Sequence, residues 1–432
     1  MSYIHWNRWL VAITTAPLIM LAALSWSYIA RADAVLDWNE IAVNMISTAS
    51  PPRPGPVGFL DMAIVQAAVY DAVQAIGGKF KPYHVEIPGA SGSPEAAAAK
   101  AAHGVLVSIF PVQEASLDTA YRDYLTKKGL AENDPGVAVG QTAAAGILAL
   151  RANDGRVPNP LPPPFTGDTA TGVWRPTASY QPPPSSGAPM ATPWLGAVRC
   201  FTLQSGNQFR AKPPPALNSQ QYATDYNEVK ALGAQSNSAR TPEQSELAYF
   251  YAGKNGTNFV LWHRALRDVA AAHVKDIGDN ARLLAMTNLA IADAVITAWD
   301  SKKHHVLWRP VTAIQEAEND GNPATASDKS WQPFLNTPPY PDYTSGANAV
   351  TGALTRSLAL FFGTDDMTFT ATSDYPQAAQ KTRSYSRFSD MATDMVNVRI
   401  YHGIHFRSAD EVAREQGTKV AEWVFGHVAA SR

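Results

Sequence analysis

The C-terminal third of this 432-residue chain contains three short segments whose side chains could bind one anion together. The first, WDSKKHHVLWRPVTAI (299–314), places Lys302 and Arg309 seven residues apart, with Pro310 directly after the arginine. A planar guanidinium held beside a proline can grip an oxyanion, and a lysine ammonium adds a point charge. The alternative is a solvated basic turn, the commoner role of such a cluster. We expect Pro310 to stop any helix at Arg309.

The second segment, PPYPDYTSGANAV (338–350), has a proline-rich lead-in that stops at Ser345-Gly346, where an apolar helical pattern begins. The start of a helix has unpaired N–H groups and a partial positive charge, so it can hold an anion. In the alternative reading, the hydroxyl of Ser345 or Thr344 simply caps its own helix.

The third segment, VNVRIYHGIHFRSADEVA (396–413), places Arg399 at the end of a long helical pattern, Gly403 as a helix breaker and His405 directly beyond. Arg399 and His405 would not align on a continuous helix, but the break would let them converge. Asp410 could then accept the Nδ1 proton of His405 and leave Nε2 free as a nucleophile or a ligand.

Most of the chain outside these segments has the pattern of amphipathic or buried helices. Sustained period-two alternation is absent, so we expect an all-α fold of helical bundles without a large sheet. The sequence predicts helices over 60–76, 96–110, 135–150, 242–251, 281–299, 347–362 and 376–400, several of them marked by Ser-Pro, Asp-Pro or Thr-Pro starts.

Residues 156–215 form a long irregular segment rich in proline, glycine and serine. It could be a domain linker, but it also carries aromatic residues, which favour loops packed over a surface. We therefore expect an ordered insertion between two helical halves. These aromatic residues are Trp174, Tyr180, Trp194 and Phe201.

A weak internal repeat supports two related bundles. The stretches IVQAAVYDAVQA (64–75) and LAIADAVITA (289–298) each place one acid, Asp71 or Asp293, inside an Ala/Val helix. We expect these buried acids to be structural hydrogen-bond acceptors more often than catalysts.

The bulk composition limits the choice of partners. The formal net charge is −2, so nucleic acid is not expected as a partner. The single cysteine, Cys200, excludes an intramolecular disulfide.

The N-terminal residues resemble an export signal, with Arg8 before an apolar run over 9–26 and two small-x-small sites at 30–32 and 32–34. We expect a signal peptide over 1–34 and a mature chain over 35–432 that is periplasmic or secreted, with an uncleaved membrane anchor as the alternative. No later stretch is expected to cross a bilayer.

Together, Lys302-x6-Arg309-Pro310, Ser345-Gly346 and Arg399-x5-His405 resemble the site pattern of the vanadium-dependent haloperoxidases and the type 2 phosphatidic acid phosphatases. The family pattern is Lys-x6-Arg-Pro, Pro-Ser-Gly-His and Ser-Arg-x5-His-x3-Asp. Two further stretches, ARLLAMTNLAIADAVITAWDSK and GVWRPT, look like the bacterial haloperoxidase-like branch. The resemblance runs from about residue 38 to the C-terminus, and it makes 281–432 the half with the oxyanion site.

This resemblance implies a role for each residue of the pattern. A multiply charged oxyanion, vanadate or alternatively phosphate, would need several fixed cations and N–H donors around it. His405 would bind vanadium in a haloperoxidase or attack phosphorus in a phosphatase, with Asp410 supporting it. The cofactor-binding residues would be Lys302, Arg309, Ser345, Gly346 and Arg399.

The sequence departs from the family pattern at four positions. Thr344 replaces the proline, Val398 replaces the serine, and Asp410 lies five residues after His405 instead of four. Ala347 stands where the family has its second histidine, the acid/base group, and alanine cannot transfer a proton. Groups within reach by sequence that could substitute are His402, His304, His305 and Asn348.

The leading functional hypothesis is a vanadate-binding haloperoxidase-like oxidoreductase that uses hydrogen peroxide to oxidise halide or a small organic substrate. The alternatives are a periplasmic acid phosphatase with His405 as its nucleophile and a non-catalytic oxyanion-binding protein. No membrane partner is expected after signal cleavage, and a homodimer is one option for the oligomeric state.

Overall fold

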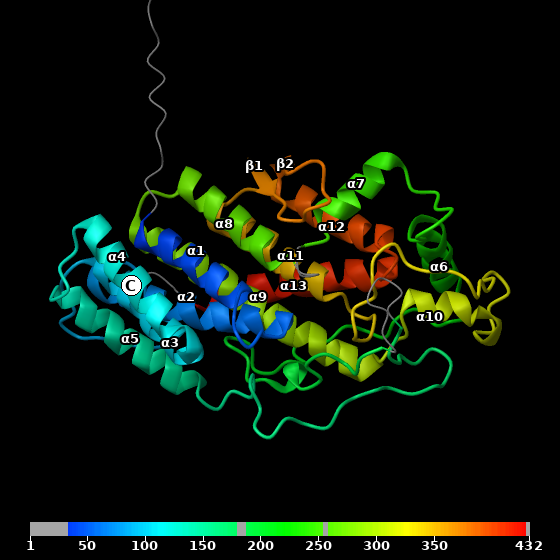
Figure 1. The fold of residues 1–432 in the computed structure, drawn as a ribbon, viewed down its shortest axis with the longest axis horizontal. Helices are drawn as coiled ribbons and strands as arrows, with labels where there is room; N and C mark the ends of the chain where they lie inside the picture. The colour runs from blue at the N-terminus through cyan, green and yellow to red at the C-terminus, as the bar shows by residue number, and fades with distance from the viewer. Residues whose placement is uncertain (1–32, 179–186, 254–257, 429–432) are drawn as a thin grey trace, which may run out of the picture. The chain divides into compact units, whose positions relative to one another are not determined.

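The structure, a computed structural model, describes residues 33–178, 187–253 and 258–428. Within these residues it contains thirteen α-helices and one two-stranded sheet (Figure 1). The helices are α1 (Ala34–Ser47), α2 (Gly55–Gly77), α3 (Pro94–Ile109), α4 (Glu114–Lys128), α5 (Pro135–Arg151), α6 (Gln220–Leu232), α7 (Pro242–Phe250), α8 (Phe259–His273), α9 (Ile277–His305), α10 (Pro310–Gln315), α11 (Gly346–Phe362), α12 (Phe388–Tyr401) and α13 (Arg407–His427). The predicted all-α class is confirmed.

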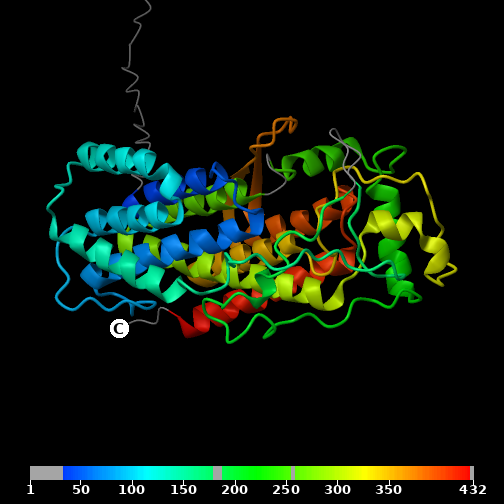
Figure 2. The same cartoon turned by 60° about the horizontal axis from the view of Figure 1, so that its bottom comes forward.

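Two sets of three helices form most of the core. Helices α2, α3 and α5 pack against one another, α9, α11 and α13 do the same, and α2 packs on α9 between the two sets. In Figures 1 and 2 the cyan α3 and α5 lie to one side of α2, away from the red α13. Every residue of α2 over 57–74 and of α9 over 283–299 is buried, because their many small residues let neighbouring helices approach on all sides.

The two sets share one anchoring device. Asp71 of α2 accepts hydrogen bonds of 2.6–3.0 Å from the backbone N–H groups of residues 83–85. Asp293 of α9 accepts bonds of 2.7–3.1 Å from the N–H groups of residues 201–203. Each carboxylate therefore holds a loop across its own central helix, which confirms both the repeat and the structural role of the two acids.

The outer helices of the two sets also meet at equivalent close contacts. A Cβ atom on Gly140 of α5 would lie 2.4 Å from the carbonyl oxygen of Ala97 in α3. A Cβ atom on Gly417 of α13 would lie 2.1 Å from the carbonyl oxygen of Ala349 in α11. Both alanines are four residues after a serine N-cap, so the same interhelical contact recurs at the same distance from the helix start.

The helix predicted over 376–400 is wrong in its first half. A β-hairpin of β1 (Asp366–Thr372) and β2 (Thr382–Arg387) occupies this region, with Phe369 paired to Tyr385, and α12 starts only at Phe388. The two paired rings stack with centroids 5.3 Å apart, and Phe369 also packs on Phe388. This cross-strand aromatic pair stabilises the extended form where sequence periodicity alone suggested a helix.

Pro310 starts a helix instead of only stopping one. The long helix α9 runs on to His305 and ends where Val306 adopts a left-handed conformation, with φ 49°. Pro310 is then the first residue of α10, a position where its missing N–H costs nothing, and Arg309 is the N-cap. This break fixes Lys302 and Arg309 on two different elements.

The proline-rich insertion packs against the core through its apolar side chains in the described part of 156–215. Trp174 and Leu195 are fully buried, Phe201 is nearly so, and the short 3₁₀ turn at Leu195–Ala197 contacts α9. Tyr180 lies outside the described residues.

The expectation that no later stretch could cross a bilayer is wrong by length and composition. Helices α2 and α9 both meet those criteria, but 89% and 94% of their most apolar windows lie buried inside the protein. They are core helices here. The predicted signal peptide lies outside the described residues except for its last two, Asp33 and Ala34, which form the start of α1.

Candidate active site

Lys302 lies fully buried in the last turn of α9. Its Nζ donates hydrogen bonds to the carbonyl oxygens of Pro341 at 2.7 Å and Asp342 at 3.1 Å. The ammonium also lies 4.7 Å from the centre of the Tyr340 ring. The lysine therefore ties the proline-rich lead-in of α11 to the end of α9, and its charge is placed inside the protein instead of in solvent.

Arg309 is also fully buried, which excludes the solvated basic turn. Its Nε donates to the carbonyl oxygen of Tyr340 and its Nη1 to that of Ile404, both at 2.7 Å. Nη1 also lies 3.2 Å from Nε2 of His405, whereas Nη2 has no hydrogen-bond partner among the described residues. One edge of the guanidinium is thus fixed by the backbone and the other is available to a guest.

The start of α11 carries no side-chain cap. Ser345 is the N-cap residue, but its hydroxyl accepts no hydrogen bond from a backbone N–H group of the first turn and instead accepts one of 3.4 Å from Nδ2 of Asn348. The Thr344 hydroxyl donates to Oε1 of Gln416 at 2.6 Å and so points elsewhere. The simple N-cap reading is therefore excluded for both hydroxyls, and the first N–H groups of α11 are left to another acceptor.

His405 pairs with Asp342, not with Asp410 as predicted. Its Nδ1 lies 2.8 Å from Oδ1 of Asp342, and both residues are buried. The prediction was wrong because the chain turns back after Gly403 and brings His405 against the lead-in of α11. The signal that could have revealed Asp342 is an acid inside an otherwise apolar, proline-rich stretch.

Asp410 contributes to the helix start instead. Its Oδ1 accepts a hydrogen bond of 2.8 Å from Nδ2 of Asn348. Burial raises the pKa of Asp410 well above its usual value, and hydrogen bonding from Ser345 and the charge of Arg399 oppose this rise. Asp410 therefore lies beside Ser345 and Asn348 at the start of α11.

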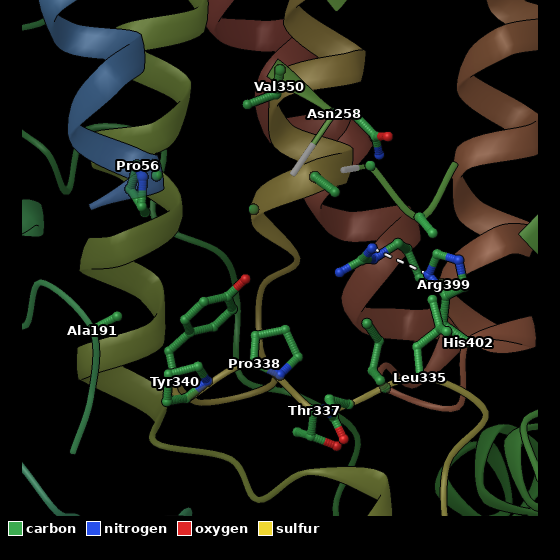
Figure 3. A pocket seen from close by; sticks show the side chains of 18 of the residues that line it. Pro56, Ala191, Asn258, Leu335, Thr337, Pro338, Tyr340, Val350, Arg399 and His402 are labelled. Carbon is green, nitrogen blue, oxygen red and sulfur yellow. Dashed lines mark hydrogen bonds between the residues drawn. The ribbon is translucent and has the colours of Figure 1, made fainter. Parts of the chain in front are cut away.

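Of the three predicted cations, Arg399 is the one whose side chain lines the cavity at the start of α11. This cavity has a volume of about 580 Å³, and Gly346 and Ala347 also line it. Nη1 donates toward Nδ1 of His402 at 3.3 Å, and Figure 3 shows the guanidinium pointing across the cavity toward Tyr340. The Nε atom has no partner among the described residues.

Burial and mutual repulsion set the charges in this cluster. Burial lowers the pKa of Lys302 well below its usual value, and Arg309 lowers it further. Burial, followed by Arg309 and Lys302, also lowers the pKa of His405. Burial raises the pKa of Asp342 to about 7, against the effect of the same two cations. The His405–Asp342 contact is therefore one between a neutral imidazole and a carboxyl group that is partly protonated at neutral pH.

The unpaired groups fit a bound oxyanion. Nη2 of Arg309 and Nε of Arg399 are buried donors without an acceptor, and such donors are costly to leave unmade. Oδ1 of Asn348 and Oδ2 of Asp410 are buried acceptors without a donor. An anion that carries both bare and protonated oxygens, as vanadate and phosphate do, would satisfy both kinds of group.

Comparison with known proteins agrees with this geometry. Residues 282–432 match the family model described as the VCPO second helical-bundle domain, and all seven predicted site residues lie in that range. A vanadium chloroperoxidase from Curvularia inaequalis is 27% identical over 201 residues. That match covers 39% of this chain but only 32% of the relative, so the chain matches about a third of its length.

Solved structures extend the similarity to nearly the whole chain. A bacterial vanadium-dependent iodoperoxidase superposes with a TM-score of 0.77 at 25% identity, over 92% of this chain and 96% of the other. The apo form of a bacterial vanadium-dependent chloroperoxidase shares the fold at 19% identity, with a TM-score of 0.69 over 86% and 92% of the two chains. Residues 282–432 therefore match the second helical-bundle domain of the vanadium haloperoxidases, and the chain as a whole has their fold.

Within this haloperoxidase-like site, one of the four candidates for the missing acid/base group lines the cavity. Nε2 of His305 donates to the carbonyl oxygen of Ala211 at 3.0 Å, and His304 lines a different pocket. Asn348 is engaged by Asp410. His402 remains, directly beside Arg399 in the cavity wall.

His402 is held in one tautomer. Its Nε2 lies 2.7 Å from the carbonyl oxygen of Ala248, which can only accept, so Nε2 carries the proton. Its Nδ1 lone pair then faces Arg399. Burial and Arg399 lower the pKa of His402 to about 3. At neutral pH the site therefore has the neutral imidazole of His402 beside Arg399, and Ala347 supplies no proton.

Proposed function

We propose that this protein is an exported, vanadate-dependent haloperoxidase-like oxidoreductase that uses hydrogen peroxide to oxidise a halide or a small organic molecule. The observation that carries the proposal is a pair of buried donors without acceptors, Nη2 of Arg309 beside His405 and Nε of Arg399 on the cavity that also reaches the start of α11. Similarity to the vanadium haloperoxidases supports the choice of vanadate as the anion.

Each residue has a distinct task in holding vanadate. Arg309 and Arg399 would donate from their unpaired nitrogens, and the first N–H groups of α11 would add their dipole. A bound anion would raise the lowered pKa of Lys302, so the ammonium would then offset the charge of the anion. His405 would supply Nε2 as the metal ligand. When bound, vanadate supplies a Lewis-acid centre that activates peroxide toward halide.

The His405 ring is prepared for that task by its neighbours. Nη1 of Arg309, which can only donate, lies 3.2 Å from Nε2, so the lone pair is on Nε2 and the ring proton is on Nδ1, 2.8 Å from Oδ1 of Asp342. Burial and then the neighbouring cations keep the pKa of His405 low, so the imidazole remains neutral and able to ligate at neutral pH. Asp342 therefore orients His405, the role that the sequence assigned to Asp410.

Proton supply is the step at which this chain differs from the family pattern. Ala347 offers no proton, and His402 can accept one but has none to donate at neutral pH. We infer that turnover is slow unless the proton arrives from solvent or from the substrate. General acid/base groups typically contribute about 10²–10⁴-fold in rate, which sets the scale of the loss.

The test is calorimetric titration of the purified protein with vanadate, followed by assays of bromide oxidation with hydrogen peroxide. Arg399→Ala removes charge-assisted hydrogen bonds worth about 1.5–3 kcal/mol, so vanadate affinity should fall by about 10- to 150-fold. Arg356→Ala is the matched control, because this arginine lies on α11 but pairs with Glu422 at the surface. Affinity unchanged in both Arg399→Ala and His405→Ala would refute the site.

The same preparation separates the remaining alternatives. Hydrolysis of a nitrophenyl phosphate, lost in His405→Ala, would identify a phosphatase instead, since that leaving group needs little protonation. Vanadate binding with neither activity would identify a non-catalytic oxyanion-binding protein. Bromide oxidation that depends on added vanadate would support the proposal.

A further inference from the structure

Arg399 is held less firmly than Arg309, the other arginine of the proposed oxyanion site. Two nitrogens of Arg309 donate to backbone carbonyl oxygens at 2.7 Å, and these two bonds fix the plane of its guanidinium. Within the described residues, the Arg399 side chain makes one hydrogen bond, from Nη1 to Nδ1 of His402 at 3.3 Å (Figure 3). The direction of Arg399 in the cavity therefore depends on one imidazole.

Both ring nitrogens of His402 are in use. Nε2 lies 2.7 Å from the carbonyl oxygen of Ala248, which can only accept, and the Arg399 guanidinium beside Nδ1 can only donate. The neutral ring satisfies both neighbours at once. A proton at Nδ1 would instead point an N–H at the guanidinium and release Arg399, and the low pKa of His402, about 3, agrees with this geometry.

The His402 ring is itself anchored by α7 and by the residues that lead into it. Nη1 of Arg240 donates to the carbonyl oxygen of Tyr401 at 3.3 Å, and Nε2 of Gln244 donates to the Tyr401 hydroxyl at 3.2 Å. Ala248, one turn further along α7, accepts from His402. This segment therefore holds two consecutive residues at the end of α12 at three points, and the imidazole has a fixed base from which to orient Arg399.

We propose that His402 is a positioning residue, whose Nδ1 lone pair directs the Arg399 guanidinium so that its unpaired Nε stays available to an oxyanion. A long side chain that is already ordered loses less entropy when the anion binds, so affinity rises. Position 402 falls within the x5 of the family pattern Ser-Arg-x5-His, and the pattern therefore does not require a histidine there. As a contribution to vanadate binding this inference rests on the proposed function, but the contact between His402 and Arg399 does not.

The test compares His402→Asn with His402→Phe by calorimetric titration of the full chain with vanadate. Both variants lose the hydrogen bond to Ala248. The amide oxygen of asparagine can take the place of Nδ1, whereas the phenyl ring keeps the shape of the imidazole and offers no acceptor. His402→Phe should bind vanadate about tenfold more weakly than the wild type, and His402→Asn should stay within about threefold. A ring that only fills space predicts the opposite order.

A second measurement uses the wild-type chain without vanadate. Ring ¹⁵N spectra at neutral pH should show His402 as the neutral tautomer with its proton on Nε2. In Arg399→Ala the Nδ1 resonance should move downfield, because its lone pair loses the N–H donor. Arg356→Ala is the control, since this arginine pairs with Glu422 at the surface, and it should leave the resonance in place. An Nδ1 resonance that is the same in the wild type and in Arg399→Ala would overturn the inference.

The two measurements separate this inference from the proposed function. If the wild type binds no vanadate but the Nδ1 resonance moves in Arg399→Ala, the proposed function fails and the positioning of Arg399 by His402 is supported. If vanadate binds and His402→Phe holds it at least as tightly as His402→Asn, the oxyanion site stands and the positioning role is refuted.

Discussion

Replacing Ala347 by histidine should restore the proton-transfer group that the site lacks. Ala347 is the second residue of α11 and lines the cavity, so an imidazole there enters open space instead of a packed wall. His402, already in that wall, holds its only proton against a backbone carbonyl and cannot replace it. Ala347→His therefore changes one function at a position that already faces the proposed vanadate.

The expected gain exceeds the expected costs. An acid/base group contributes about 10²–10⁴-fold, or about 3–5.5 kcal/mol of transition-state stabilisation. Histidine in place of alanine costs up to about 0.7 kcal/mol in helix propensity. The N-terminal helix dipole disfavours the protonated ring by about 0.3–1 kcal/mol, so the pKa of the new imidazole should lie below that of a free histidine. The rate should rise at least about 10²-fold, with an optimum on the acidic side of neutral.

The assay is bromide oxidation at saturating vanadate and peroxide, with vanadate affinity measured in parallel. Ala347→Gln is the matched control, because glutamine has similar reach and hydrogen-bonds but does not transfer protons. If glutamine raises kcat as much as histidine, space or polarity is the missing element. If neither variant changes kcat while vanadate stays bound, the absent proton donor does not limit turnover and the reasoning fails.

Three further predictions concern the scaffold. Burial raises the pKa of Asp71 to about 6. The free energy of unfolding of the wild type should therefore fall by about 3 kcal/mol as pH rises from about 4 to 6, because the unfolded chain releases this proton first. Urea unfolding of Asp71→Asn should show no such fall. Asp293→Ala leaves three N–H groups unpaired and should cost about 3 kcal/mol or more, again by urea unfolding. N-terminal sequencing of exported protein should find Asp33, not Val35, because Asp33 caps α1 and the next N–H bonds Glu95.

Local signals in the sequence were sufficient for much of the fold. Serine or threonine followed by proline marks the starts of α3 and α7 correctly, because such caps act within one turn. The hairpin before α12 could not be predicted in this way. Its stability depends on Phe369 and Tyr385 meeting across strands and on Phe369 packing on Phe388, contacts between distant residues that periodicity does not report.

The candidate site was likewise predictable where it depends on local sequence and not where it depends on contacts between distant residues. Types and spacing were enough to bring together Lys302, Arg309, Arg399 and His405. The partner of His405 was missed, because Asp342 is 63 residues away in the chain and meets it only after both flanking segments turn back. The openness of the Ser345 helix start was also beyond the sequence, since the same residue type caps its own helix at Ser93.

The two equivalent helix starts, at Ser93 and Ser345, differ in how their first N–H groups are satisfied. At Ser93 the hydroxyl accepts from Ala96, and Asp134 accepts from the Ser93 N–H, so that end is closed by its own side chains. At Ser345 no side chain closes the end. The start of α3 is thus closed by side chains, whereas the start of α11 keeps backbone N–H groups available to an anion. A side chain that accepts from the first N–H groups of α11, as Ser93 does at the start of α3, should leave the fold intact and abolish vanadate binding.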